Sequence, residues 1–205
     1  MKMRATISFT FDDGVRSQVD WALPIFEEFG FKVTFFVIAG QLAVGWDEWR
    51  AIAARGHEIG NHSLTHPLGG LPAVRDDGSL EHEIVASARL ITEKLGHTPV
   101  SFAYPFNKRN ARVRAVARRY HPFVRERWHR YGAWWCNLWL ANARVDRAIA
   151  RGEWLVPMLH GVETGFQPVS RDFIRAHLQH ITSRQVLVDT FGAVSARWQA
   201  ESQAW

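Results

Sequence analysis

The stretch RATISFTFDDG at residues 4–14 carries the first structural signal of this 205-residue chain. Its β-branched and aromatic residues predict a buried strand, and two adjacent carboxylates, Asp12 and Asp13, end that strand before Gly14. A helical pattern and a second strand-like run follow directly. A strand, a helix and a further strand in this order are typical of a parallel sheet with crossover helices.

The same alternation continues along the chain. Strands are expected at residues 4–11, 32–38, 57–60, 100–103, 122–125, 154–159 and 185–188. Helices are expected at residues 15–29, 47–55, 80–95, 111–120, 171–182 and 192–199, with a further helix-like stretch at 141–150. We therefore predict an α/β fold, a distorted (β/α)7-type barrel with parallel strands, in one domain that spans residues 1–205.

Composition and charge bear on the partners of the chain. Lysine and arginine number 25 against 20 aspartate and glutamate, which gives a formal net charge of +5, and basic residues are dense between residues 109 and 130. A solvated helix face is the favoured interpretation of this density. No nucleic-acid partner is expected, because no motif with regular spacing accompanies it. Cys136 is the only cysteine, so no intrachain disulfide can form.

The sequence also bears on localisation. No apolar run is long enough to span a bilayer, so no membrane insertion is expected. The N-terminal residues lead directly into the first strand without the apolar stretch of a signal peptide. The chain as given is expected to be cytoplasmic, and a secreted protein that had lost its leader would have the same pattern. The sequence does not indicate an oligomeric state.

Polar residues follow the expected strands where function usually collects in α/β proteins. The loops at the carboxyl ends of parallel strands vary freely over a rigid base, so active sites lie there. The residues in such positions are Asp12, Asp13, His62, His66, His160 and residues 104–107. We therefore expect the active site at the carboxyl ends of the strands.

His62 and His66 are four residues apart, a spacing at which two imidazoles can bind one metal ion if the backbone turns. Pro67 disfavours a helix at His66, which places the pair on a tight loop. One carboxylate added to two imidazoles makes a hydrolytic metal site with an open position for water. One divalent metal is expected, with Zn²⁺ favoured and Co²⁺, Ni²⁺ or Mn²⁺ as substitutes.

At this point the sequence resembles the polysaccharide deacetylase family, which is carbohydrate esterase family 4 with its NodB-homology domain. The resemblance covers nearly the whole chain and rests on four segments in the family's order. They are Thr10-Phe11-Asp12-Asp13-Gly14, His62-Ser63-Leu64-Thr65-His66, Phe102-Ala103-Tyr104-Pro105-Phe106-Asn107 and Met158-Leu159-His160-Gly161.

The resemblance implies a role for each of these polar residues. The implied metal ligands are Asp13, His62 and His66. Asp12 stays off the metal and acts as general base on water, and His160 acts as general acid on the leaving group. An acetylated saccharide is the implied substrate.

The family also implies a backbone N–H donor to the oxyanion in the loop after the fourth strand. We assign this donor to Phe106, with Tyr104 as the alternative, because Pro105 has no N–H. The residues expected to contact the substrate are Tyr104, Pro105, Met158 and Trp135.

The sequence departs from the family pattern in two places. Ala103 stands where many members carry an arginine that pairs with the catalytic aspartate, and Arg125 at the end of the next strand could supply that charge. The family's fourth motif has no clean match. Its tryptophan wall could be replaced by Trp134, Trp135 or Trp139, whereas Asp146, in place of its carboxylate, is better explained as a solvated surface residue.

Several functions agree with these residues. The first is hydrolysis of N- or O-linked acetyl groups on a carbohydrate, and the sequence does not separate the two bonds. A deformylase or another amide hydrolase on the same fold is an alternative. A glycan-binding module without activity is a third, since Ala103 and the missing fourth motif agree with it.

Overall fold

The computed structural model describes residues 5–132, 136–184 and 186–203. The chain divides into two compact units. The first unit comprises Met1–Phe11, Val15–Thr34 and Arg127–Trp205, and the second comprises Asp12–Gly14 and Phe35–Glu126. One domain over residues 1–205 stays a prediction.

The strands of the first unit pair in parallel. A three-stranded sheet has the order β10 (Leu187–Val188), β1 (Thr6–Ile7), β8 (Trp154–Leu155). The first two residues of β2 (Thr10–Asp13) pair with β9 (Pro157–Leu159), which also pairs with β7 (His129–Arg130). Strand β7 was not expected from the sequence.

Two strands expected to be continuous are interrupted, which corrects the sequence prediction. Residues 4–11 and 154–159 each divide into two short strands, β1 with β2 and β8 with β9. At the interruption, the Ser8 backbone N–H donates to Leu155 O at 3.0 Å, and the indole of Trp154 donates to Ser8 Oγ at 3.0 Å. The side-chain pattern alternates through residues 4–11 and is apolar throughout residues 154–159, so periodicity does not reveal either break.

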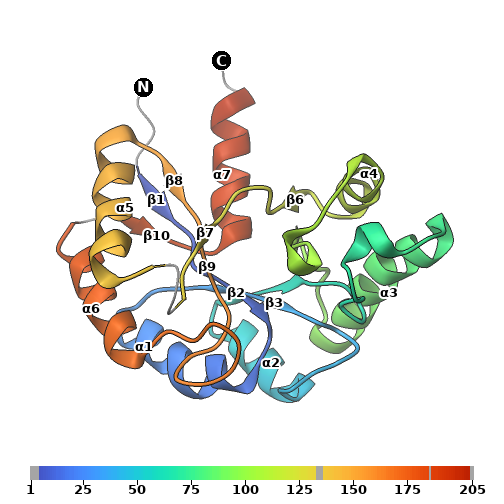
Figure 1. Cartoon of the computed structure of the whole chain (residues 1–205), viewed down its shortest axis with the longest axis horizontal. Helices are drawn as coiled ribbons and strands as arrows, with labels where there is room; N and C mark the ends of the chain where they lie inside the picture. The colour runs from blue at the N-terminus through green and yellow to red at the C-terminus, as the bar shows by residue number, and fades with distance from the viewer. Residues whose placement is uncertain (1–4, 133–135, 185, 204–205) are drawn as a thin grey trace. The chain divides into compact units, whose positions relative to one another are not determined.

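Helices cover the strands of the first unit. They are α1 (Leu23–Glu28), α5 (Leu138–Arg151), α6 (Arg171–Thr182) and α7 (Phe191–Gln203), with a π-helical turn at Gln18–Ala22 before α1. Helix α6 contacts both α1 and α5, and it lies between them in Figure 1. Phe26 of α1 packs its ring against Phe9 and Phe11, at centroid distances of 4.9 and 5.6 Å.

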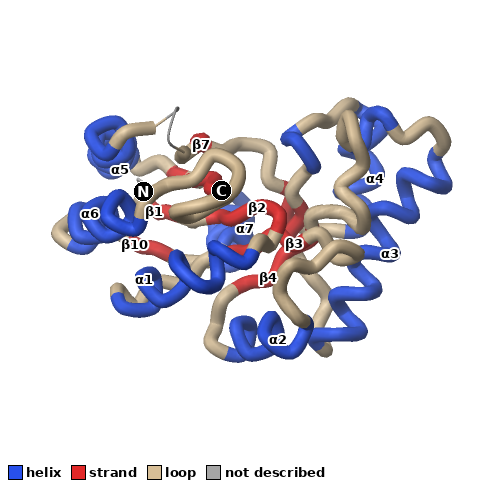
Figure 2. Tube along the Cα trace, turned by 60° about the horizontal axis from the view of Figure 1, so that its bottom comes forward, coloured by secondary structure: helices blue, strands red, loops and turns tan. Residues whose placement is uncertain are grey.

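The second unit has the strand order β6 (Phe123–Val124), β5 (Ser101–Phe102), β4 (Glu58–Asn61), β3 (Thr34–Val37). Strand β5 is parallel to both β4 and β6. The helices are α2 (Trp46–Ala54), α3 (Asp77–Leu95) and α4 (Ala111–Tyr120). Helices α2 and α3 both contact β4, as can be followed in Figure 2.

A buried polar network joins β4 to two helices of the second unit. Asn61 donates to Ile84 O at 3.0 Å and to His121 Nε2 at 3.1 Å, and accepts from the Ser87 hydroxyl at 2.5 Å. Burial lowers the pKa of His121 to about 4, so its imidazole is neutral and can accept this bond. The end of β4, which leads into the first expected metal ligand, is therefore rigidly held.

The predicted α/β class with parallel strands and intervening helices is confirmed. Helix α4 and helix α6 have the predicted bounds, because Asn110 and Ser170 accept hydrogen bonds from the backbone of their first turns. Gly96 ends α3 in the left-handed conformation. None of the helices in the described part of the chain is long and apolar enough to cross a membrane.

Candidate active site

Three side chains of the second unit converge on one point. Asp13 Oδ1 lies 3.4 Å from His62 Nε2 and 3.6 Å from His66 Nε2. Within the described residues, this is the only group of three or more potential metal ligands whose donor atoms all lie within 4.8 Å of one another. Two imidazoles and a carboxylate match the donor set of a catalytic divalent metal site.

The contacts of the two imidazoles direct their Nε2 atoms at Asp13. His62 Nδ1 lies 2.9 Å from the carbonyl oxygen of Ala103, which can only accept, so Nδ1 carries a proton and Nε2 is the nitrogen that faces Asp13. Burial, reinforced by His62, lowers the pKa of His66, although Asp13 opposes this shift. Nε2 of each imidazole thus faces Asp13, and the lowered pKa of His66 favours its neutral form.

The turn that joins the two histidines uses an unusual backbone. Ser63 and His66 have positive φ angles of 70° and 53°, in the left-handed region that side chains disfavour. Local hydrogen bonds hold this conformation: Asn61 Oδ1 accepts from the Ser63 N–H at 2.8 Å, and Ser63 Oγ accepts from the His66 N–H at 3.0 Å. The sequence correctly placed the pair on a tight loop.

Glu83 of α3 fastens the same loop and was not identified from the sequence. Its carboxylate accepts from the Thr65 hydroxyl at 2.7 Å and from the Thr65 N–H at 3.0 Å, and its carbonyl accepts from the Leu64 N–H at 3.0 Å. In the sequence, a single glutamate on an amphipathic helix looks the same as a glutamate exposed to solvent. Glu83 therefore holds the loop that carries His62 and His66, the expected metal ligands.

We expect Glu83→Gln to weaken Zn²⁺ binding by about 10-fold to 100-fold, because outer residues that orient metal ligands contribute this much to affinity. The affinity is measured by competition with a chromophoric chelator. Glu93→Gln on the exposed part of the same helix is the matched control, since Glu93 forms an exposed salt bridge with its neighbour Lys94. Equal affinities for the two variants would contradict the role of Glu83.

Asp12 lies apart from the metal cluster, in a buried ion pair. Successive side chains at a strand end point to opposite sides, and Asp13 in addition has a φ of 75°. Arg125 NH1 and NH2 donate to Asp12 Oδ1 and Oδ2, each at 2.6 Å, and both side chains are almost fully buried. Arg125, which follows β6, thus pairs with Asp12. Ala103, which stands where many family members have an arginine, has no side chain that could form this pair.

The loop that was expected to supply an oxyanion donor is a short helical turn, Pro105–Asn107. Phe106 and Asn107 both have a φ of 56°, and the Phe106 ring lies 4.4 Å from the ring of His66. The side chain of Phe106 is half exposed beside the metal cluster. The Phe106 side chain therefore lies beside one of the expected metal ligands, and the role of its backbone N–H stays a prediction.

Tyr104 and Pro105, which are predicted to contact the substrate, belong to the second unit. Both are buried, and the Tyr104 ring belongs to the core cluster of the second unit, packed against Phe102. The Tyr104 hydroxyl donates to Glu126 Oε1 at 3.1 Å. The aromatic ring is a structural element of the loop, because its whole surface is occupied by protein.

The other predicted residues belong to the first unit. The carbonyl of His160 accepts from Gln18 Nε2 at 3.0 Å, and its ring lies 5.2 Å from that of Phe166. Met158 is fully buried. Trp134 and Trp135 lie outside the described residues, and Trp139 is exposed on α5.

Asp146 contacts His180 and Arg184 at 2.9 and 3.0 Å on the surface of the first unit. Its carboxylate is therefore occupied by surface partners, as the sequence indicated.

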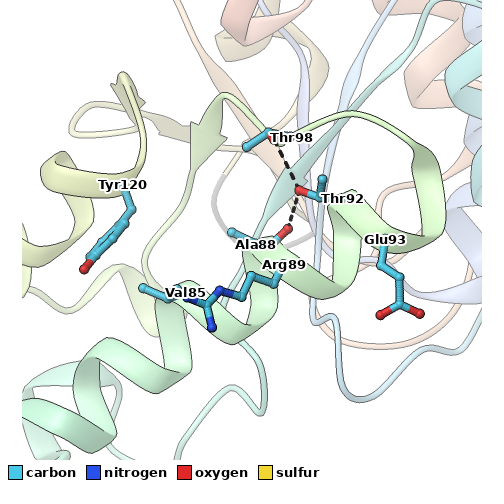
Figure 3. A pocket seen from close by; sticks show the side chains of 7 residues that line it. All are labelled: Val85, Ala88, Arg89, Thr92, Glu93, Thr98 and Tyr120. Carbon is cyan, nitrogen blue, oxygen red and sulfur yellow. Dashed lines mark hydrogen bonds between the residues drawn. The ribbon is translucent and has the colours of Figure 1, made fainter.

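The second unit also has a separate groove of about 470 Å³ on α3, shown in Figure 3. Its lining includes Val85, Thr92 and Tyr120 and shares no residue with the metal cluster. The Thr92 hydroxyl already bonds to Ala88 O at 2.8 Å and to Thr98 at 3.4 Å. The Thr92 hydroxyl is thus occupied by protein partners, and no residue that lines the groove belongs to the group formed by Asp13, His62 and His66.

Comparison with known proteins identifies relatives of this chain. The chain is 32% identical over 108 residues to a chitooligosaccharide deacetylase of Rhizobium leguminosarum bv. trifolii, covering 52% of this chain and 49% of that protein. The chain spans no more than about half the length of the curated relatives it matches.

Solved structures share the fold. A peptidoglycan N-acetylglucosamine deacetylase superposes with a TM-score of 0.72 at 18% identity, covering 94% of this chain and 89% of that one. A family 4 acetyl xylan esterase from Clostridium thermocellum, solved in complex with a cobalt ion, gives 0.67 at 22% identity, with 90% and 87% covered.

A family model described as polysaccharide deacetylase matches residues 2–121. That segment contains Asp12, Asp13, His62 and His66, and it ends before Arg125. The resemblance proposed from the motifs is therefore confirmed, and the chain belongs to the polysaccharide deacetylase family.

Proposed function

We propose that this chain is a metal-dependent hydrolase that removes acetyl groups from a carbohydrate. The observation that carries the proposal is that two adjacent carboxylates, Asp12 and Asp13, have different partners. Asp13 joins His62 and His66 in the metal cluster, whereas Asp12 is held away from it by Arg125. A hydrolase that activates water needs both a metal ligand and a base, and this geometry supplies one of each.

The donor set fits one divalent cation, and Zn²⁺ is the ion we propose because imidazole and carboxylate ligands suit it. A cation bound to this set would lower the pKa of water and polarise a carbonyl. The Co²⁺, Ni²⁺ and Mn²⁺ ions accept the same ligands and are the alternatives.

The remaining steps belong to residues of the chain. Asp12, kept ionised by the guanidinium of Arg125, accepts the proton of the attacking water. The backbone N–H of Phe106 donates to the oxygen of the acetyl carbonyl as negative charge develops there. His160 donates a proton to the departing amine or alkoxide, an assignment that rests on its family motif.

Acetate release from acetylated xylan and from N-acetylglucosamine oligomers tests the proposal. We expect release by the Zn²⁺-loaded protein, loss of release after chelation, and recovery when Zn²⁺ is restored. His66→Ala should lose both the metal and the activity, because it removes one of three protein ligands. The ratio of activities on the two panels also shows whether the ester or the amide is preferred.

No acetate from either panel, with protein shown to contain one equivalent of Zn²⁺, would overturn the proposal. Formate release from N-formylated sugars would then indicate the deformylase alternative. Saccharide binding without turnover would indicate a binding module.

A further inference from the structure

The arginines that follow the active-site loop gather on one carboxylate, Glu126. Glu126 Oε2 accepts from Arg109 Nε at 2.9 Å and from Arg114 Nε at 3.4 Å, and Oε1 accepts from Arg118 at 3.1 Å and from the Tyr104 hydroxyl at 3.1 Å. The basic density between residues 109 and 130 is therefore not only a solvated helix face. Three of its arginines, Arg109, Arg114 and Arg118, bind one carboxylate that was not identified from the sequence.

These contacts hold the loop Pro105–Asn107 at both of its ends. Tyr104 precedes the loop and bonds to the Glu126 carboxylate. Arg109 follows the loop, and its other nitrogens donate to the carbonyls of Asn107 at 2.9 Å and of Glu126 at 3.0 Å. One residue thus fixes the entry and the exit of a turn that contains two positive φ angles.

Glu126 is also the neighbour of Arg125, which pairs with Asp12. The same Arg125 donates from NH2 to the side chain of Asn107 at 3.3 Å. The proposed base and the proposed oxyanion donor, Phe106, are therefore linked through adjacent residues at the end of β6. A small displacement of the loop changes the distance between these two groups, which catalysis tolerates poorly.

The protonation states of Tyr104 and Glu126 at neutral pH agree with a lasting hydrogen bond between them. Burial and the adjacent Glu126 carboxylate raise the pKa of Tyr104, so its hydroxyl keeps the proton it donates. Burial raises the pKa of Glu126, but the bond from Tyr104 and the three arginines outweigh it and lower that pKa. The carboxylate is thus ionised at neutral pH.

We propose that Glu126 is a positioning residue for the reaction, which clamps the loop Pro105–Asn107 so that the Phe106 N–H is held opposite the Asp12–Arg125 pair. This inference rests on the proposed function for its catalytic consequence. Glu126 contacts neither the metal ligands nor Phe106 in the described structure, and it acts through Tyr104 and Arg109.

Glu126→Gln tests the clamp, because it keeps the shape and removes the charge that three guanidinium groups share. We expect kcat to fall about 10-fold to 100-fold, with KM within about twofold and Zn²⁺ content unchanged. Tyr104→Phe, which removes one hydroxyl, should have a smaller effect in the same direction. Asp77→Asn, which removes an exposed partner of Arg112 in the same unit, is the matched control and should leave kcat unchanged.

A second measurement does not depend on activity. Hydrogen exchange of the segment at residues 104–109 reports the bonds from Asn107 N–H to Tyr104 O and from Lys108 N–H to Pro105 O, at 2.8 and 3.1 Å. We expect faster exchange of this segment in Glu126→Gln and wild-type exchange in Asp77→Asn. Exchange equal to that of the wild type in Glu126→Gln would overturn the clamp.

The two measurements separate the clamp from the proposed function. A wild-type protein that releases no acetate overturns the proposed function, and exchange alone then decides the clamp. Faster exchange with unchanged kcat would overturn the catalytic role of Glu126, and so would a fall in melting temperature with unchanged kcat in the folded protein.

Discussion

Asp12→Asn is expected to lower kcat for acetate release by about 10²-fold to 10⁴-fold, the contribution of a positioned general base. Asparagine has nearly the same shape but cannot accept the proton of water. Because Asp12 lies outside the metal cluster, the Zn²⁺ content of this variant should equal that of the wild type. Steady-state kinetics and metal analysis of the same preparation check both statements.

The control for this variant is Asp20→Asn, since Asp20 forms an exposed salt bridge with Arg16 at 3.5 Å and should not affect activity. Asp12→Asn also leaves the buried guanidinium of Arg125 with a neutral partner, so thermal unfolding must show that the variant is folded at the assay temperature. A variant that is folded, contains metal and retains more than a tenth of the wild-type kcat would exclude Asp12 as the base.

Arg125→Met is expected to lower the free energy of unfolding by about 3–5 kcal/mol, the usual effect of leaving one member of a buried ion pair uncompensated. The carboxylate of Asp12 is almost fully buried, and the variant would lose both of its 2.6 Å bonds from Arg125. Equilibrium unfolding in urea measures the change. Arg16→Met removes an exposed arginine and should cost no more than about 1 kcal/mol.

The double variant Asp12→Asn/Arg125→Met distinguishes an uncompensated charge from a simple loss of packing. Neutralising Asp12 removes the buried charge, so the double variant should be about 1–3 kcal/mol more stable than Arg125→Met alone. A double variant less stable than Arg125→Met would show that the guanidinium matters through its packing, for example over the Phe36 ring at 5.0 Å. Neither variant should restore activity.

Local signals explain what the sequence predicted of the fold. Helix bounds at α4 and α6 follow from Asn110 and Ser170, because a capping side chain marks the first turn in the sequence itself. The interruptions within residues 4–11 and 154–159 depend on pairing between distant strands, at Ser8 and Trp154. No pattern within either segment contains that information.

The site divides in the same way. The convergence of Asp13, His62 and His66 was predictable from the spacing of the histidines and the family resemblance, whereas their roles and that of Asp12 stay predictions. Arg125 was placed from its position after an expected strand. Glu83 and Glu126 were missed, because each acts through a fold-dependent contact and a lone glutamate is usually solvated.

The order in which segments of the two units follow one another along the chain affects how recombination can exchange parts of this gene. The second unit takes Asp12–Gly14 from one part of the chain and Phe35–Glu126 from another, with Val15–Thr34 of the first unit between them. A gene segment that encodes residues 35–126 would carry both histidines and Arg125 but neither carboxylate. A single crossover between residues 13 and 125 would therefore take at least one of the proposed ligands, the base and its arginine from a different parent.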